Sequence, residues 1–257
     1  MMGIIENMSN EEYHSQNGIS STAVKSVFKK SLAHWKGEKR RQTAAFSMGS
    51  AVHALLLEED RDLVVKGPKT RKSKGFTELE ENAGPDQIVL TEVEYHVANR
   101  MATETLKNPV CKKALRHKDR QNEVSIFSEC ERTGLVLKTR PDLYIPSEGA
   151  VYDVKTTQDA SPLGFAKECW KYSYDIQAAF YIYTCRMAGI SVDKFKFIAV
   201  EKAAPYASHM HIVSPNLLDN ATENMHKVLA TIKEATDKED FGTGWGEYSI
   251  LELPKWR

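Results

Sequence analysis

The centre of the chain reads Arg140-Pro-Asp-Leu-Tyr-Ile-Pro-Ser-Glu-Gly-Ala-Val-Tyr-Asp-Val-Lys155, and this stretch decides the fold. Two strand-like runs flank the turn sequence Pro146-Ser-Glu-Gly149, a pattern that predicts a β-hairpin. If the turn lies between Ser147 and Glu148, residues that face each other across the hairpin have numbers that add up to 295. The position of the turn therefore fixes the register of the two strands.

In this register two carboxylates meet. Asp142 faces Asp153, and Arg140 faces Lys155. Like charges placed opposite each other in an antiparallel pair are destabilising, so the two carboxylates need a shared proton or a cation between them. Because side chains alternate along a strand, Asp153 and Lys155 also share one face. The pattern predicts a site for a hard divalent ion such as Mg²⁺, with Lys155 orienting or deprotonating a metal-bound water, which is chemistry for phosphodiester hydrolysis. The alternative is a surface hairpin with scattered charges.

Outward from the hairpin, the periodicity predicts a mixed α/β fold. We expect helices over 20–30, after Ser47, over 92–117 with a break at Pro109, over 176–187 and over 215–238. We expect a three-stranded meander over 124–127, 134–145 and 151–156, and further strands over 194–200 and 207–213. The stretch from Lys66 to Gly75 has turn residues and no apolar period, so we predict a mobile surface loop there. The order of elements predicts a mixed central β-sheet flanked by helices, with an N-terminal helical part.

The composition excludes several classes of protein. The 257 residues carry 35 Lys and Arg against 35 Asp and Glu, so any basic surface must be local. One such patch lies between Lys25 and Arg41, where the candidates for contacts with a DNA backbone are Lys29, Lys30, Arg40 and Arg41. A solvated helix face is the alternative. The sequence shows no membrane span and no signal peptide at its start, so we expect a cytosolic protein. The four cysteines form no closely spaced group, so we expect no iron–sulfur cluster.

Five segments, in order and spacing, resemble the RecE-like exonucleases (exodeoxyribonuclease VIII family) of the PD-(D/E)xK nuclease superfamily. They are Met48–His53, Thr139–Asp142, Tyr152–Thr157, Asp159–Ala166 and Gln177–Tyr181. The resemblance spans nearly the whole chain. It implies a PD-(D/E)xK core in a single domain over 1–257, mainly helical over 1–120 and with the sheet-containing catalytic core over 121–257.

The resemblance also implies roles for particular residues. His53 matches a helix-borne histidine that helps to bind metal, and Asp142 matches a direct metal ligand. Asp153 and Lys155 match the (D/E)xK pair, in which the acid ligates metal and the lysine activates or positions the attacking water. From the residues alone, His53 would more often be a packed side chain than a Mg²⁺ ligand.

Gln177 and Tyr181 are further candidate catalytic residues, and Glu123 and Arg140 are candidates for supporting or DNA-binding roles. Gln177 and Tyr181 lie four apart on one helical face and match a motif that closes the site and contacts the DNA strand; an amphipathic core edge is the alternative. Glu123 is a candidate for an acid that supports a metal ligand or binds a second metal ion; an ordinary acid at the start of a strand is the alternative. Arg140 could hold a phosphate with its planar fork, or form an ion pair with Asp142 or Asp153.

For function, the resemblance implies a Mg²⁺-dependent, ATP-independent exonuclease, in which Mn²⁺ can substitute. Such an enzyme digests one strand of linear double-stranded DNA from its 5′ end and leaves a 3′ overhang for recombination by single-strand annealing. The implied partners are a ring-like homo-oligomer, tetrameric or trimeric, and a RecT-like annealing protein of a phage or prophage in the cytoplasm of a bacterial host. No P-loop pattern is present, so we expect no nucleotide cofactor. The rivals are a RecB- or Cas4-like nuclease, an endonuclease of the same fold, and a catalytically silent DNA-binding module.

Overall fold

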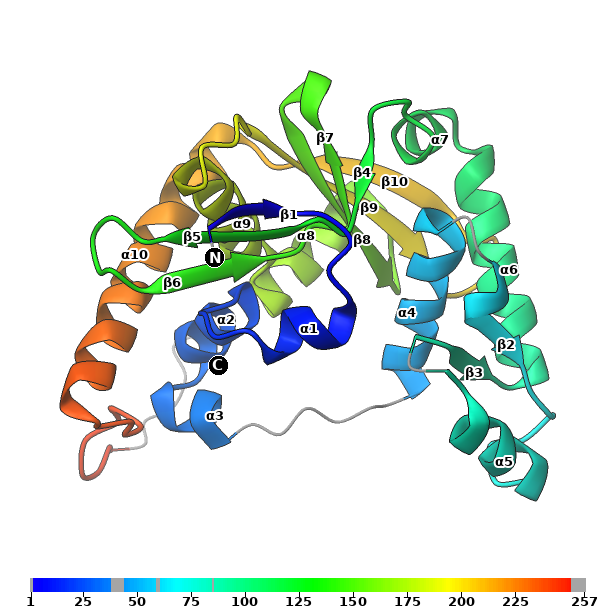
Figure 1. The fold of residues 1–257 in the computed structure, drawn as a ribbon, viewed down its shortest axis with the longest axis horizontal. Helices are drawn as coiled ribbons and strands as arrows, with labels where there is room; N and C mark the ends of the chain where they lie inside the picture. The colour runs from blue at the N-terminus through cyan, green and yellow to red at the C-terminus, as the bar shows by residue number, and fades with distance from the viewer. Residues whose placement is uncertain (1, 38–43, 59–60, 85, 251–257) are drawn as a thin grey trace.

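The computed structural model describes residues 2–37, 44–58, 61–84 and 86–250 (Figure 1). Its centre is a mixed five-stranded sheet in the order β10-β9-β8-β7-β4. The strands are β4 (Gln121–Asn122), β7 (Leu143–Ile145), β8 (Ala150–Thr157), β9 (Lys194–Glu201) and β10 (Ser208–Ile212). Strands β8 and β9 are parallel, and the other neighbours in this sheet are antiparallel.

Two smaller sheets lie beside the central one. In the first, β5 (Ser125–Glu129) pairs with β1 (Gly3–Ile5) on one side and with β6 (Val136–Thr139) on the other. In the second, β2 (Val64–Lys66) and β3 (Ile88–Leu90) run parallel. The helices are α1 (Asn10–Ser15), α2 (Ser21–Lys29), α3 (Leu32–Gly37), α4 (Ala44–Leu57), α5 (Lys74–Asn82), α6 (Glu92–Lys107), α7 (Pro109–Leu115), α8 (Pro162–Tyr172), α9 (Tyr174–Met187) and α10 (Pro215–Lys238).

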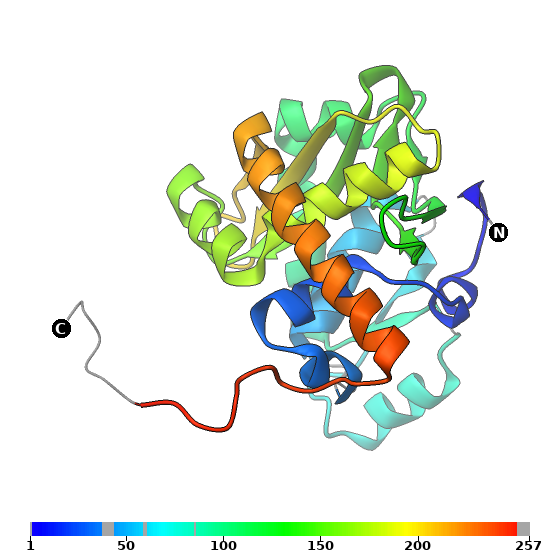
Figure 2. The same ribbon diagram turned by 90° about the vertical axis from the view of Figure 1, so that its left-hand side faces the viewer.

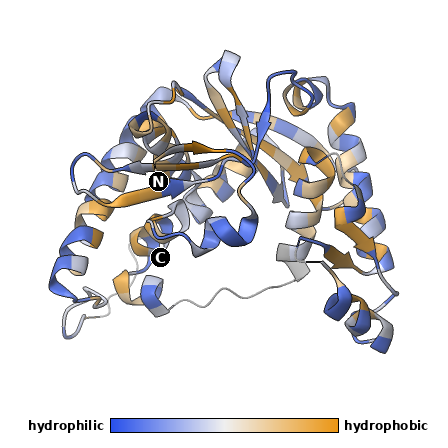
Figure 3. Ribbon diagram, in the orientation of Figure 1, coloured by the Kyte–Doolittle hydropathy of each residue, from blue (hydrophilic) through white to orange (hydrophobic). Residues whose placement is uncertain are grey.

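Alternation along the strands gives the sheet two apolar faces with separate cores. Val151 of β8 and Phe197 of β9 belong to a cluster with α9, α10 and α2. Tyr152, Val154 and Ile198, which point the opposite way, belong to a cluster with α4, α6 and α7. Figures 1 and 2 show these two helical layers on either side of the sheet, and Figure 3 shows that the central strands are largely hydrophobic. Asp153 and Lys155 have the same parity as Val151, so they face the α9 layer.

Several predicted helices are confirmed together with their boundaries. Ser20 caps α2 by accepting a hydrogen bond from the Ala23 N–H at 3.4 Å. The predicted break at Pro109 separates α6 from α7, with Asn108 as the cap between them. Helix α10 covers 215–238 as predicted. Helix α4 begins at Ala44, before the predicted start at Ser47.

The hairpin register is confirmed, but the three-stranded meander is wrong. Leu143 pairs with Tyr152 and Ile145 with Ala150, which is the predicted register. The stretch 134–145, predicted as one strand, forms β6 and β7, which belong to different sheets. Pro141 lies between them and has no N–H to donate to a strand ladder, so the stretch cannot continue as one strand.

Helix α8 was not predicted. The stretch 66–75 contains a loop between β2 and α5, as the sequence predicts. In this loop the Gly67 N–H donates to Leu90 O at 2.7 Å, and the Arg71 guanidinium donates to Glu94 at 2.9 and 3.2 Å. Within the described residues, no helix is long and apolar enough to cross a membrane.

Candidate active site

The hairpin places two carboxylates beside each other, as the sequence predicts. Asp142 directly precedes β7, and its Oδ2 accepts a hydrogen bond of 2.6 Å from the Val154 N–H on β8. Burial raises the pKa of the Asp142 carboxyl to about 7; the His53 charge opposes the rise and the Asp153 charge adds to it. The buried carboxylate of Asp142 is therefore costly to hold in its charged form without a cation.

Asp153 is held by two residues from different elements. It is 3% exposed and lies in the middle of β8. The Gln177 side chain on α9 donates Nε2–H to Asp153 Oδ1, and Lys155 Nζ forms an ion pair with Oδ2. Oδ2 is buried and has no hydrogen bond beyond this ion pair. The structure thus brings Lys155 and Gln177 together on Asp153, and the predicted shared face of Asp153 and Lys155 is confirmed.

Lys25 is a member of this cluster that the sequence analysis did not single out. Its Nζ, on the partly buried face of α2, donates to Gln177 Oε1 at 2.7 Å. Burial lowers the pKa of the Lys25 ammonium to about 7, and the nearby Lys155 charge lowers it further, whereas the Asp153 charge raises it. The only sequence signal was its place in a basic stretch, because Lys25 and Gln177 are 152 positions apart.

His53 reaches the same hairpin from the opposite side of the sheet. It lies on α4, its Nε2 is 2.7 Å from Val154 O, and its Nδ1 is 3.5 Å from Asp142 Oδ2. Nε2 therefore carries the proton donated to the carbonyl when the imidazole is neutral. The structure brings His53 and Asp142 together.

These residues suit a hard divalent ion as donors. The Asp153 charge disfavours the charged form of the Asp142 carboxyl, and within the part of the chain that the structure describes the buried Asp153 Oδ2 has no partner besides Lys155. Among the described residues, no three His, Cys, Asp or Glu side chains form a ready-made metal cluster. The residues that would hold an ion are Asp142, Asp153 and His53, with water completing the shell.

Tyr181 lies one helical turn after Gln177 and is nearly buried, with 9% of its surface exposed. Together with Asp142 it lines a pocket of about 450 Å³. Burial first, and then the charge of Asp153, raise the pKa of the Tyr181 phenol well above its usual value. Tyr181 therefore keeps its proton and can act only as a neutral hydrogen-bonding or packing group.

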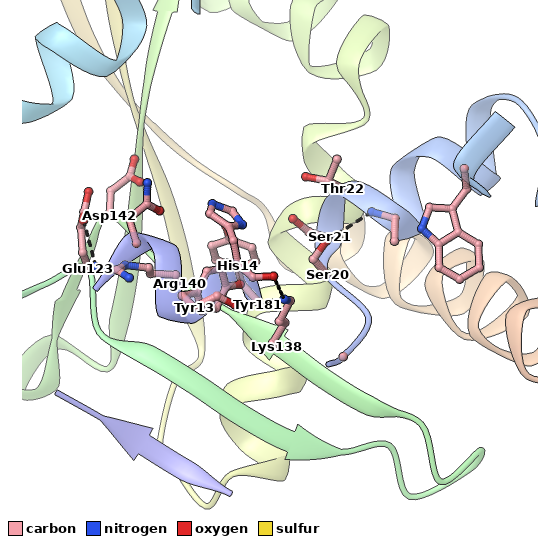
Figure 4. A pocket seen from close by; sticks show the side chains of 14 residues that line it. Tyr13, His14, Ser20, Ser21, Thr22, Glu123, Lys138, Arg140, Asp142 and Tyr181 are labelled. Carbon is pink, nitrogen blue, oxygen red and sulfur yellow. Dashed lines mark hydrogen bonds and ion pairs between the residues drawn. The ribbon is translucent and has the colours of Figure 1, made fainter. Parts of the chain in front are cut away.

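The pocket opens between α1, the start of α2 and the chain around β6 and β7 (Figure 4). Lys138 lies in its wall, but its Nζ donates to the carbonyls of Tyr13, His14 and Gln16 at 3.0, 3.3 and 2.6 Å. An ammonium has three N–H donors, so Lys138 has none left for a ligand. Its role is to hold α1 and the following residues against β6.

The predicted position of Arg140 opposite Lys155 is wrong, because Arg140 lies between β6 and β7, outside the ladder that β7 forms with β8. The guanidinium donates to Ser9 O at 3.2 Å and to Glu123 Oε2 at 3.3 Å, so its ion pair is neither with Asp142 nor with Asp153. Glu123 has a positive φ of 47° and its N–H donates to Asp142 O at 3.2 Å. Both residues line the pocket (Figure 4), where Arg140 Nε is buried and has no hydrogen bond.

The basic patch is only partly described. Lys29 and Lys30 are exposed at the end of α2, and Lys29 Nζ donates to the Lys171 carbonyl at the end of α8. Arg40 and Arg41 lie outside the described residues. Lys29 follows Lys25 by one helical turn, so α2 presents one lysine inside the site and one at its edge.

The mixed sheet, the paired aspartates on the β7–β8 hairpin and the adjacent lysine are the arrangement expected of a PDDEXK-like domain. The chain belongs to the family described as "PDDEXK-like domain of unknown function (DUF3799)", whose sequence profile matches residues 21–251. No curated protein matches the chain.

Two solved structures are similar to this chain. A candidate exonuclease from Eubacterium rectale has a TM-score of 0.65 at 17% identity, over 97% of this chain and 96% of that one, which shows a shared fold. A phage-related exonuclease from Haemophilus somnus has a TM-score of 0.38 at 13% identity, over 88% of this chain and 98% of that one.

Proposed function

We propose that this protein is a RecE-like, Mg²⁺-dependent and ATP-independent exonuclease that digests one strand of linear double-stranded DNA from the 5′ end. The observation that carries the proposal is the connected set of side chains on Asp153. Lys155 and Gln177 both contact its carboxylate, and Lys25 contacts Gln177. A surface hairpin with scattered charges, the alternative considered for the sequence, would not be buried and would not link three elements.

The chemistry follows from what each residue can do. Mg²⁺ bound at Asp142, Asp153 and His53 would polarise the scissile phosphate and lower the pKa of a bound water. Lys155 Nζ lies against Asp153, where it can donate to the attacking water or to a phosphate oxygen. Gln177 and Lys25 keep the Asp153 carboxylate in place. The carboxylate is therefore already oriented when the reaction takes place, and no entropy is lost in ordering it.

The pocket beside Asp142 is suited to a polyanion. The start of α2 and Arg140, whose Nε has no hydrogen bond to the described residues, both line it, and a helix N-terminus and a guanidinium both favour a phosphate. The 5′-to-3′ polarity, the 3′ overhang, the ring-like homo-oligomer and the RecT-like annealing partner in a bacterial cytoplasm rest on the resemblance and are part of the proposal.

A digestion assay tests the proposal. Linear duplex DNA labelled separately at its 5′ and 3′ ends is incubated with wild type and with Lys155→Ala, in Mg²⁺ or in EDTA. Lys194→Ala is the matched control, since Lys194 is exposed on the neighbouring strand and pairs with Ala150, five residues before Lys155. We expect Mg²⁺-dependent loss of the 5′ label, retained by Lys194→Ala and abolished by Lys155→Ala.

Covalently closed circular DNA separates the rivals. An exonuclease spares the circle, whereas cutting of the circle would assign the site to an endonuclease. Binding of duplex DNA without digestion by wild type would assign the chain to a catalytically silent module.

A further inference from the structure

Two tyrosines are brought together where α8 meets α9. Ser173 separates the helices in a left-handed conformation, with φ 52° and ψ 50°. Residues two apart on a continuous helix point in different directions, so Tyr172 and Tyr174 would not meet without this break. With it, the two rings stack, with centroids 5.6 Å apart and planes 29° apart. The left-handed conformation of Ser173 costs free energy, and it brings the two tyrosine rings into contact.

The inner ring of the pair borders the active site. Lys155 Nζ lies 5.1 Å from the centroid of the Tyr174 ring, and Lys25 Nζ lies 5.6 Å from it. Behind it, Phe165 stacks at 6.0 Å and Phe197 packs at 5.6 Å, which fixes the position of the ring. Tyr174 therefore contacts the active-site lysines Lys155 and Lys25 as well as Tyr172.

The outer ring is open to solvent. Tyr172 is 44% exposed, and Lys171 Nζ lies 5.1 Å from the centroid of its ring. Lys29 Nζ, from α2, donates to the carbonyl of Lys171. Flat aromatic surface beside several lysines suits a ligand that has both flat rings and negative charge, as single-stranded DNA has in its bases and phosphates. Glu168 is the opposing acid, one helical turn before Tyr172.

We propose that the Tyr172–Tyr174 pair is a stacking platform for an unpaired base of the DNA strand next to the phosphate held at Asp153 and Lys155. This inference rests on the proposed nuclease function for the direction of the strand. The platform is sequence-tolerant, since every base has a flat face. It holds the nucleotide beside the reacting phosphate, so the scissile bond stays at Lys155 while the rest of the strand moves.

Single-strand binding in EDTA, without cleavage, tests the platform. The probe is a fluorescein-labelled oligothymidylate, and an abasic deoxyribose-phosphate strand of the same length is the second probe. We expect Tyr172→Ala to weaken oligothymidylate binding about tenfold, the order expected for the loss of one stacked base, and Tyr172→Phe to bind as wild type does. The abasic strand should bind wild type and Tyr172→Ala equally.

Trp170→Ala is the matched control. Trp170 is more exposed than Tyr172, at 65%, and lies two residues earlier on α8, so it points away from Tyr172. Tyr172 is half exposed, so its loss should leave the melting temperature unchanged, which circular dichroism checks. Equal weakening by Trp170→Ala, equal binding by Tyr172→Ala and wild type, or a tyrosine effect that persists on the abasic strand would each overturn the proposal.

The nuclease proposal and the platform fail separately. If the wild type digests no DNA and the Tyr172→Ala variant binds oligothymidylate more weakly than the wild type, the nuclease proposal is wrong and the platform stands. If wild type digests DNA and the tyrosine variants bind normally, the platform is wrong and the nuclease stands. If Tyr172→Ala instead dissociates an oligomer in sedimentation without changing DNA affinity, the pair is a self-association surface and the platform is wrong.

Discussion

At the scale of the residue, the Gln177 amide has two neighbours that permit only one orientation. The Lys25 ammonium can only donate hydrogen bonds, so it requires the Gln177 oxygen. The ionised Asp153 carboxylate can only accept them, so it requires the Gln177 nitrogen. Lys25 thereby fixes which end of the amide reaches Asp153, and it acts on that carboxylate through Gln177.

Replacing Lys25 by methionine should therefore lower activity through Asp153. A hydrogen bond to a charged group contributes about 1.5–3 kcal/mol, so we expect a decrease of about 10- to 100-fold in the single-turnover rate of DNA digestion. Lys25→Arg, which keeps the donor, should recover part of the rate. Lys194→Met is the control and should retain it. A Lys25→Met variant with the wild-type rate would show that the amide is oriented without Lys25.

At the scale of the element, the junction between α8 and α9 depends on one residue in a left-handed conformation. Ser173 is 3% exposed, and its side chain makes no capping hydrogen bond to α9. The free-energy cost of Ser173 at this position is therefore that of its left-handed backbone conformation.

Comparing Ser173→Gly with Ser173→Ala isolates this cost, because neither variant has the hydroxyl. Glycine adopts positive φ freely and alanine does not, so we expect the glycine variant to be more stable by about 1 kcal/mol. Urea denaturation measures the difference. A more stable alanine variant would mean that the junction relaxes out of the left-handed region.

A second junction, between β10 and α8, contains a titratable side chain, His211. His211 Nε2 is 3.1 Å from Ala160 O, and the imidazole stacks on Phe165 at 4.4 Å. Burial lowers the pKa of His211 below its usual value of about 6.5, the bond to Ala160 opposes the change, and the His209 charge adds to it. The unfolded chain therefore binds the proton more readily than the folded protein does.

Stability should consequently be retained above about pH 6.5 and fall as the pH drops below it. In His211→Gln, which cannot titrate, we expect a smaller decrease in melting temperature between pH 7.5 and pH 5 than in wild type. Differential scanning calorimetry at the two pH values checks this. An identical decrease in both proteins would place the acid sensitivity elsewhere.

At the scale of the whole molecule, the two cores share one sheet, and the paired carboxylates lie within it. Mg²⁺ that binds the folded protein and not the unfolded chain stabilises the folded state by mass action, by about 2.7 kcal/mol at a hundredfold excess over its dissociation constant.

We therefore expect Mg²⁺ to raise the melting temperature of wild type by several degrees relative to EDTA. Asp153→Asn should lose this increase, because the variant lacks one of the two buried negative charges that attract the ion. Asp193→Asn, at an exposed acid before β9, is the control and should keep it. An equal increase in Asp153→Asn would remove Asp153 from the metal site.

The features that depend on neighbours along the chain could be predicted from the sequence. The turn fixed the hairpin register, alternation put Asp153 and Lys155 on one face, and Asn108 with Pro109 fixed a helix break, because each depends on residues only a few positions apart. Within the same stretch, the separation of β6 from β7 was missed, since a strand pattern does not say which sheet each half joins.

Which distant residues meet at the site depends on the packing of the folded chain. Lys25 reaches Gln177 across 152 positions, and Arg140 pairs with Glu123 and not with the aspartates. No periodicity encodes such contacts, because they depend on how the helices pack on each face of the sheet. The hydrophobic burial that orders those layers is not directional, so the pairing of the polar groups is set by the packed geometry.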